Sequence, residues 1–186
     1  MKLYIRNMVS NRCRMIVKSE IQKLGFHFVV VELGAVELLE DLSAEQKETL
    51  DTNLNKMGLS LINDKKSILI ERIKNAIVDL IYYTDKLPKT NFSDYLSEKL
   101  DYDYTYMANL FSQTLDTTIE QYIIKLKIER VKELLIYDEM NLSEIADKMH
   151  YRSLSHLSSQ FKKITGLTPS HYKNLRNHRR KPIENV

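Results

Sequence analysis

The chain has 186 residues, of which 43% are hydrophobic and 28% charged, with a formal net charge of +3. This size and composition fit one large or two small globular domains, and the low content of glycine (4) and proline (3) argues against a turn-rich β-sandwich. The single cysteine, Cys13, excludes an internal disulfide, and no apolar run approaches the roughly 20 residues of a membrane-spanning helix. We therefore expect a cytoplasmic protein that does not associate with a membrane.

Basic residues are concentrated toward the C-terminus. Residues 1–64 carry one more acidic than basic residue, whereas the remainder carries four more basic than acidic residues. Residues 177–186 are expected to form a basic tail. A basic C-terminal half is able to neutralise phosphates, although such a tail is also an ordinary solvated chain end.

The first part of the chain alternates between strand and helix patterns. Alternating apolar and polar residues predict a strand around 3–5, and apolar residues at helical spacing predict a helix over 12–24. The β-branched and aromatic residues of 26–31 predict a second strand, and a third is expected over 36–39 after a turn at Gly34.

A second helix and a last strand complete this N-terminal unit. Ser43 and Gln46 have the spacing of a capping box and open a helix that is expected to turn Leu50, Leu54 and Met57 inward. A strand over 59–62 follows. The order βαββαβ predicts a small ferredoxin-like domain over residues 1–63.

From residue 65 onward the strand signal disappears. Apolar residues at helical spacing between Ile70 and Ile81 predict an amphipathic helix that stops before Pro88. Two similar blocks follow: Leu96 matches Ile145 at a spacing of 49 residues, and Phe111 matches Phe161 at a spacing of 50. Each block reads as a short helix, a turn and a longer helix, which is the helix-turn-helix arrangement.

Local signals in the second block support this interpretation. Asn141 and Glu144 form a capping box that opens a helix ending at His150. A second helix over about 153–164 is expected to turn Leu157, Phe161 and Ile164 inward, and Gly166 ends it.

These residues resemble the AraC/XylS regulators. The resemblance is carried by 142–149, 156–158, 161–169 and Tyr172 in the second block, and by 106–111, Tyr122 and 128–135 in the first. It covers roughly residues 66–175 and implies a transcription regulator that binds double-stranded DNA, with RNA polymerase as its expected protein partner. No cofactor is expected.

The fold class predicted in this way is α+β. An all-α, seven-helix tandem helix-turn-helix domain over residues 64–176 follows the N-terminal domain and precedes the tail. The linking helix, over about 118–136, spans about 28 Å at 1.5 Å per residue. That length suits two recognition helices in successive major grooves, about 34 Å apart, so that one chain reads two half-sites.

The resemblance also assigns DNA-contacting residues. In the first recognition helix, 104–115, the residues expected at base edges are Tyr104, Thr105, Ala108, Asn109 and Ser112. In the second they are Leu154, Ser155, His156, Ser158 and Ser159. The residues expected at phosphates are Arg152, Lys162, Lys163 and Lys173.

The chain departs from the family pattern at several of these positions. Many relatives carry arginine where Asn109 and Ser159 stand, so that this chain is expected to rely less on guanine contacts, and Asn109 is suited to adenine. The usual turn glycine is replaced by Asp101 and by His150, residues that tolerate positive φ better than most.

The N-terminal unit resembles the heavy-metal-associated domains, which carry M-x-C-x-x-C between the first strand and the first helix. The corresponding segment here runs from Met8 to Cys13, with Ser10 in place of the first cysteine. Cys13 alone does not hold a soft ion such as Cu(I) unless His27 or another chain contributes. The alternative is a metal-free fold reused for packing or for homodimerisation.

Two other classes of function fit these residues less well. A metal-carrying protein is disfavoured by the missing second cysteine, and stoichiometric Cu(I) binding would revive it. An enzyme is disfavoured because there is no glycine-rich phosphate loop, no H-E-x-x-H and no Cys/His nucleophile pair. The five histidines are scattered, so that surface or core positions are their default interpretation.

Overall fold

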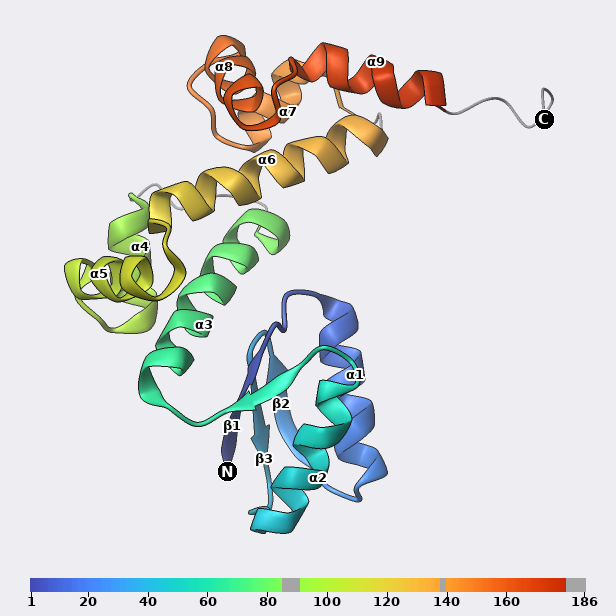
Figure 1. Cartoon of the computed structure of the whole chain (residues 1–186), viewed down its shortest axis with the longest axis vertical. Coiled ribbons are helices and arrows are strands. Elements are labelled where there is room, and N and C mark those ends of the chain that lie inside the picture. The colour runs from blue at the N-terminus through green and yellow to red at the C-terminus, as the bar shows by residue number, and fades with distance from the viewer. Residues whose placement is uncertain (85–90, 138–139, 180–186) are drawn as a thin grey trace, which may run out of the picture. The chain divides into compact units, whose positions relative to one another are not determined.

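The computed structural model describes residues 1–84, 91–137 and 140–179 (Figure 1). The chain forms two compact units: the first runs from Met1 to Tyr83 and continues to Asp116, and the second begins, apart from a short linker, at Thr117. This division falls inside the region 64–176 that was expected to form one domain. None of the described helices is long and apolar enough to span a membrane.

The N-terminal part of the first unit is a four-stranded sheet with two helices. In chain order its elements are β1 (Lys2–Arg6), α1 (Asn11–Lys23), β2 (Phe28–Glu32), β3 (Ala35–Leu38), α2 (Ala44–Asn55) and β4 (Ser60–Ile62). The strand order is β2-β3-β1-β4, with every neighbouring pair antiparallel. The register pairs Leu3 with Val36 and Ile5 with Leu61.

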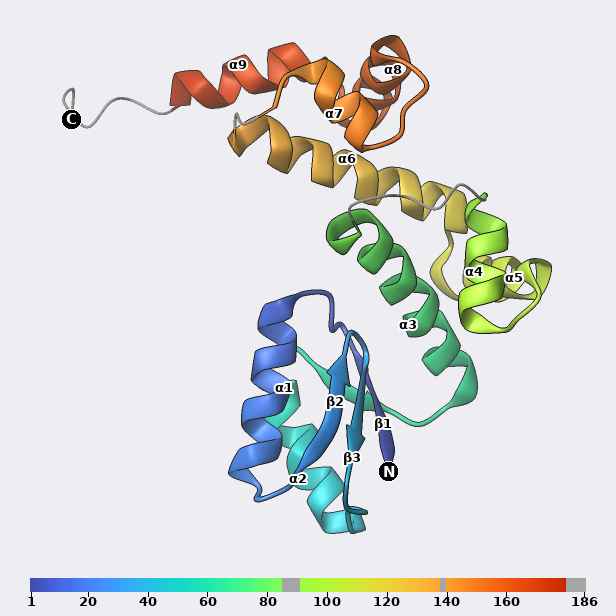
Figure 2. The same ribbon diagram turned by 180° about the vertical axis from the view of Figure 1, so that it is seen from behind.

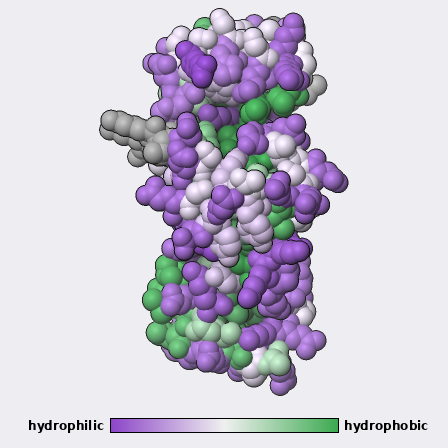
Figure 3. Space-filling view, turned by 90° about the vertical axis from the view of Figure 1, so that its left-hand side faces the viewer, coloured by the Kyte–Doolittle hydropathy of each residue, from purple (hydrophilic) through white to green (hydrophobic). Residues whose placement is uncertain are grey.

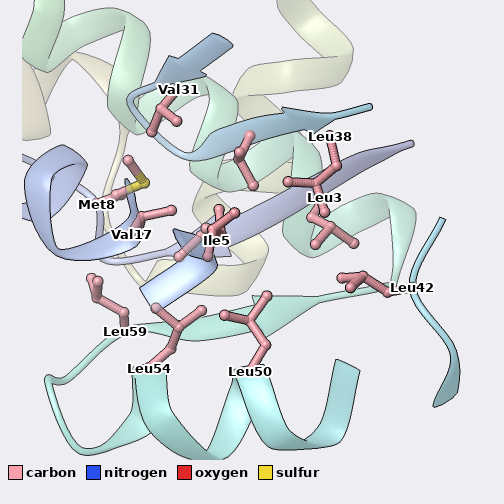
Figure 4. Packing of buried hydrophobic residues seen from close by; sticks show 12 residues of the cluster. Leu3, Ile5, Met8, Val17, Val31, Leu38, Leu42, Leu50, Leu54 and Leu59 are labelled. Carbon is pink, nitrogen blue, oxygen red and sulfur yellow. The ribbon is translucent and has the colours of Figure 1, made fainter. Parts of the chain in front are cut away.

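Helices α1 and α2 cover one face of this sheet (Figures 1 and 2). Strand β1 alternates, so that Leu3 and Ile5 enter the core between sheet and helices, where they meet Val17 of α1 and Leu54 of α2 (Figure 4). Each such buried aliphatic side chain stabilises the fold by about 1.5–3 kcal/mol. Lys2 and Tyr4 face the other side of the sheet.

The remaining chain is helical. The helices are α3 (Lys65–Val78), α4 (Phe92–Leu100), α5 (Tyr104–Leu115), α6 (Ile119–Tyr137), α7 (Leu142–Lys148), α8 (Leu154–Thr165) and α9 (Pro169–Arg179). Helix α3 continues as a short π-helix, η1 (Asp79–Tyr83). The expected number of seven α-helices is thus found within the described residues. The expected basic tail begins inside α9, and from residue 180 it lies outside the described residues.

Turn and cap predictions are confirmed. The capping boxes of Ser43 with Gln46 and of Asn141 with Glu144 both form. Asp101 and His150 adopt left-handed backbone conformations with φ of 60° and 52° in the two helix-helix turns. Gly166 ends α8 in the same conformation.

Some details differ from the expectation. Met57 is 54% exposed because α2 ends at Asn55 and leaves it in the following turn. Ile164 is 42% exposed because the inward stripe of α8 ends at Phe161. In the last turn Thr165 is half-buried instead, and its hydroxyl donates to the Phe161 carbonyl at 2.8 Å. The helix expected to end at His150 ends at Lys148.

Candidate nucleic-acid interface

Helix α5 has one buried face and one solvent face. The Asp103 carboxylate caps it by accepting from the Tyr106 backbone N–H at 2.9 Å, and Met107 and Phe111 are fully buried. The five residues expected at base edges lie on the solvent side: Thr105 and Asn109 are exposed, and Tyr104, Ala108 and Ser112 are half-buried. The Ser112 hydroxyl donates to the Ala108 carbonyl at 2.8 Å, so it is left only as an acceptor.

Two exposed tyrosines beside this face were not singled out as site residues from the sequence. The rings of Tyr102 and Tyr106 stack with centroids 6.0 Å apart and are 42% and 49% exposed. Tyr106 precedes Asn109 by three positions, so helical spacing places it next to that amide. This spacing was the sequence signal that could have identified Tyr106 as a residue of the site. Figure 3 views the molecule from the left-hand side of Figure 1, the side on which α5 lies, and hydrophilic or near-neutral colours predominate across the middle of this view.

Helix α8 repeats this arrangement in the second unit. Ser153 caps it by accepting from the His156 backbone N–H at 3.1 Å, and Leu157 and Phe161 are fully buried. Four of the residues expected at base edges are exposed and the fifth is half-buried; the exposed ones are Leu154, Ser155, His156 and Ser159, and the half-buried one is Ser158. The structure therefore places both predicted sets on the solvent faces of their helices.

The His156 ring is oriented by its neighbour. It contacts the buried ring of Tyr151 edge-on, with centroids 5.3 Å apart and planes at 80°. This contact lies at the start of α8.

Three of the four predicted phosphate contacts are exposed cations. Arg152, Lys162 and Lys163 are exposed, and Lys173 is half-buried. None of the ion pairs found among the described residues involves the first three, whereas on α6 Arg130 pairs with Glu133 at 2.8 Å. Cations without a carboxylate partner are available to bind phosphate oxygens.

A buried lysine supports the turn before α8. Lys127 of α6 donates from Nζ to the Met149 carbonyl at 2.9 Å, and Nζ lies 5.4 Å from the centroid of the Tyr151 ring. Burial lowers the pKa of Lys127 and raises the pKa of Tyr151 to about 12. The Tyr151 hydroxyl is buried and has no hydrogen-bond partner among the described residues. The amphipathic pattern of α6 did not identify Lys127, because its partner lies 22 residues away.

Cys13, the remaining candidate from the sequence, lies in the first turn of α1. Ser10 caps that helix, and its Oγ lies 3.3 Å from Cys13 Sγ in hydrogen-bond contact. Burial acts to raise the pKa of the thiol, but the hydrogen bonds from the Ser10 side chain and from nearby backbone groups outweigh it, so that the pKa is lowered. His27 pairs with Glu40 at 2.7 Å. The described residues contain no cluster of three or more metal-ligating side chains.

The chain is similar to known proteins, most clearly in its helical C-terminal part. Residues 96–175 match the family model described as a helix-turn-helix domain. The chain is 23% identical over 177 residues to the probable transcriptional regulator LumQ of Photobacterium leiognathi, covering 89% of this chain and 70% of that protein. It spans from 14% to 70% of the length of the first curated relatives that it matches.

Solved structures share the fold. The C-terminal domain of AraT, a response regulator from Geobacillus stearothermophilus, superposes with a TM-score of 0.52 at 23% identity, over 61% of this chain and 89% of that domain. The DNA-binding domain of AdpA, a global transcriptional factor solved with a target DNA, gives 0.50 at 17% identity, over 63% and 97%.

These findings support the AraC/XylS resemblance for the C-terminal region, and they give no support to the heavy-metal-associated resemblance of the N-terminal unit. The helix-turn-helix match covers both α5 and α8. Residues 96–175 of this chain therefore form a helix-turn-helix domain, and LumQ, which the chain resembles over most of its length, is named a probable transcriptional regulator.

Proposed function

We propose that this protein is a sequence-specific transcription regulator that binds two successive major-groove half-sites of double-stranded DNA with α5 and α8. The observation that carries the proposal is that α5 and α8 repeat one arrangement. Each helix follows a left-handed turn, begins at an N-cap, buries one apolar face and presents a polar face to solvent. The solved complex of the AdpA domain with its target DNA supports the use of this fold on a duplex.

The length of α6 is compatible with a tandem reading. This helix contains 19 residues and is therefore about 28 Å long at 1.5 Å per residue. One turn of B-DNA is about 34 Å, so a linking helix of this length, together with its flanking turns, is adequate for half-sites about 10 base pairs apart.

Base reading is assigned to the solvent faces of the two helices. Asn109 is the strongest candidate for direct readout because its amide is able to contact adenine with two hydrogen bonds, and His156 is the corresponding candidate on α8. The half-buried serines, Ser112 and Ser158, are small enough for their helices to approach the base edges closely. Lys162 and Lys163 bind phosphates and set position without specifying sequence, and Tyr106 adds an aromatic contact beside Asn109.

We propose further that residues 1–63 form a ferredoxin-like domain, that 64–176 form the DNA-binding domain, and that RNA polymerase is the protein partner. The element order and the strand order β2-β3-β1-β4 support the first assignment. Homodimerisation through the N-terminal domain is the proposed role of that unit. Sedimentation of the full chain in the presence and absence of DNA measures it directly.

The experiment that tests DNA reading begins with in vitro selection of DNA fragments by the full chain, followed by binding measurements on the enriched site. Asn109→Ala should lower the discrimination between correct and altered base at one half-site by about 10- to 100-fold. Lys163→Ala should weaken all duplexes alike and reduce the salt dependence by about one counterion. Lys125→Ala, an exposed lysine of α6 outside both faces, is the matched control. Equal, sequence-independent losses from Asn109→Ala and Lys163→Ala would refute the assigned reading faces.

A further inference from the structure

The first compact unit contains a cavity of about 380 Å³ on the side of the sheet opposite α2. Its walls come from β1, the start of α1, the turn between β2 and β3, α3 with η1, and the end of α4. The lining includes Lys2, Arg14, Gly34, Arg72, Asn75 and Lys99. This volume matches that of small-molecule sites, which start at about 300 Å³.

One wall of the cavity carries a buried amide with an unused acceptor. Asn75 of α3 is 6% exposed, and its Oδ1 has no hydrogen-bond partner among the described residues. Gly34 leaves room for the amide, because a Cβ at that position would lie 2.0 Å from Asn75 Nδ2. A buried polar atom without a partner destabilises the folded protein, so its presence calls for an explanation, and a bound ligand is one.

A complementary donor lines the same cavity. Arg14 Nε is also buried without a partner among the described residues. The guanidinium is nonetheless oriented, because Nη1 donates to Asn11 Oδ1 at 3.2 Å and the group lies 6.0 Å from the centroid of the Tyr83 ring. Arg14 and Asn75 thus both line the cavity, and each side chain holds a buried polar atom without a partner among the described residues.

The charge of the lining favours an anion. Lys99 is balanced by Asp79 at 2.9 Å. Lys2, Arg14 and Arg72 remain against the single carboxylate of Glu32. Arg72 is positioned by a long hydrogen bond from Nη2 to the Leu100 carbonyl at 3.5 Å, which leaves its other donors available.

We propose that this cavity binds a small organic anion that carries a carboxylate or phosphate together with a hydroxyl or amino group. The anionic oxygens accept from the guanidinium groups of Arg14 and Arg72, and the hydroxyl or amino group pairs with the side-chain amide of Asn75. Helices α3 and α4 form part of the wall and both pack against α5. The bound anion regulates DNA reading by α5; this regulatory role rests on the proposed function.

Calorimetric titration of the full chain without DNA tests the site with two matched pairs of probes. Malate is compared with succinate, which lacks only the hydroxyl, and glycerol 3-phosphate is compared with inorganic phosphate. We expect saturable binding of malate or of glycerol 3-phosphate, about tenfold tighter than its partner. The pair that binds distinguishes a carboxylate from a phosphate ligand. Absence of saturable binding for both pairs would overturn the proposal.

Variants separate the two ends of the ligand. Arg14→Met should weaken binding about tenfold or more, whereas Arg12→Met, an exposed arginine of the same helix that does not line the cavity, should not. Asn75→Leu should abolish the difference within the pair without lowering the melting temperature, because it removes an unpartnered acceptor. Equal effects of the two arginine substitutions would show nonspecific ion binding and overturn the site.

The regulatory role has its own readout. Affinity for the selected DNA site is measured with and without saturating anion, and we expect a change of about fivefold or more, which Arg14→Met removes. An unchanged affinity with the anion bound would refute the coupling. Absence of DNA binding together with intact anion binding would count against the proposed function and leave the cavity assignment standing.

Discussion

The buried hydroxyl of Tyr151 offers a sharp test of the packing before α8. Replacement by phenylalanine keeps the ring beneath Lys127 and beside His156 and removes only an oxygen without a partner among the described residues. An unsatisfied buried hydroxyl costs about 1–3 kcal/mol, so Tyr151→Phe should increase the free energy of unfolding at neutral pH by up to that amount.

The dependence of the free energy of unfolding on pH in alkaline solution gives a second quantitative test. The pKa of Tyr151 is about 12 in the folded protein, against about 10 for an unfolded tyrosine. Folding therefore favours the neutral phenol, and its contribution is complete below pH 10 and is lost as the pH rises toward 12. The difference corresponds to roughly 3 kcal/mol. Lys127 is present in both proteins, so its own titration largely cancels in the comparison.

Urea unfolding followed by far-UV circular dichroism measures both effects, since the chain has no tryptophan for fluorescence. The parent protein should lose stability more steeply than Tyr151→Phe between about pH 10 and 12. Tyr137→Phe, which alters a tyrosine 69% exposed on α6, should show neither effect. A loss of stability at neutral pH in Tyr151→Phe would refute the reasoning, because it would mean that the hydroxyl has a favourable partner.

Other substitutions probe local features of the fold. Gly34→Ala should destabilise by about 1–3 kcal/mol more than Gly58→Ala in thermal melts: both have positive φ, but only Gly34 has an atom within 4 Å of the added Cβ. Equal losses would contradict the close approach. Asn141→Ala should cost about 1 kcal/mol in urea unfolding through the lost capping box, and an unchanged midpoint would argue against that cap. Ser10→Ala should raise the pKa of the Cys13 thiol and slow its alkylation by iodoacetamide near neutral pH; a faster reaction would reverse the assigned role of Ser10.

The helices and their ends were largely predictable because their signals are local. Helix α5 has the bounds expected for it, 104–115, and both capping boxes form where residues three apart predicted them. The left-handed turns at Asp101 and His150 were also expected, since only the residue at the helix end and its tolerance of positive φ are involved. Such features depend on neighbours in the chain.

Features that depend on distant contacts were not predicted. Lys127 occupies an ordinary helical position, and nothing near it in sequence indicates that its ammonium is buried against the carbonyl of Met149. The cavity combines segments from Lys2 to Leu100, and its unused acceptor on Asn75 becomes visible only when Gly34 is placed against it. The bounds of α5 and α8 were therefore largely predictable from the sequence, whereas the contact between Lys127 and Met149 and the cavity were not.

The left-handed turns of the two helix-turn-helix units have a consequence for sequence drift. Asp101 and His150 hold a conformation that glycine adopts without strain, yet glycine there would enlarge the entropy of the unfolded chain, so the two effects partly offset each other. Exchange between glycine, aspartate and histidine at these turns is then nearly neutral for stability. Glycine, aspartate and histidine can then replace one another at these turns while the left-handed backbone conformation is kept.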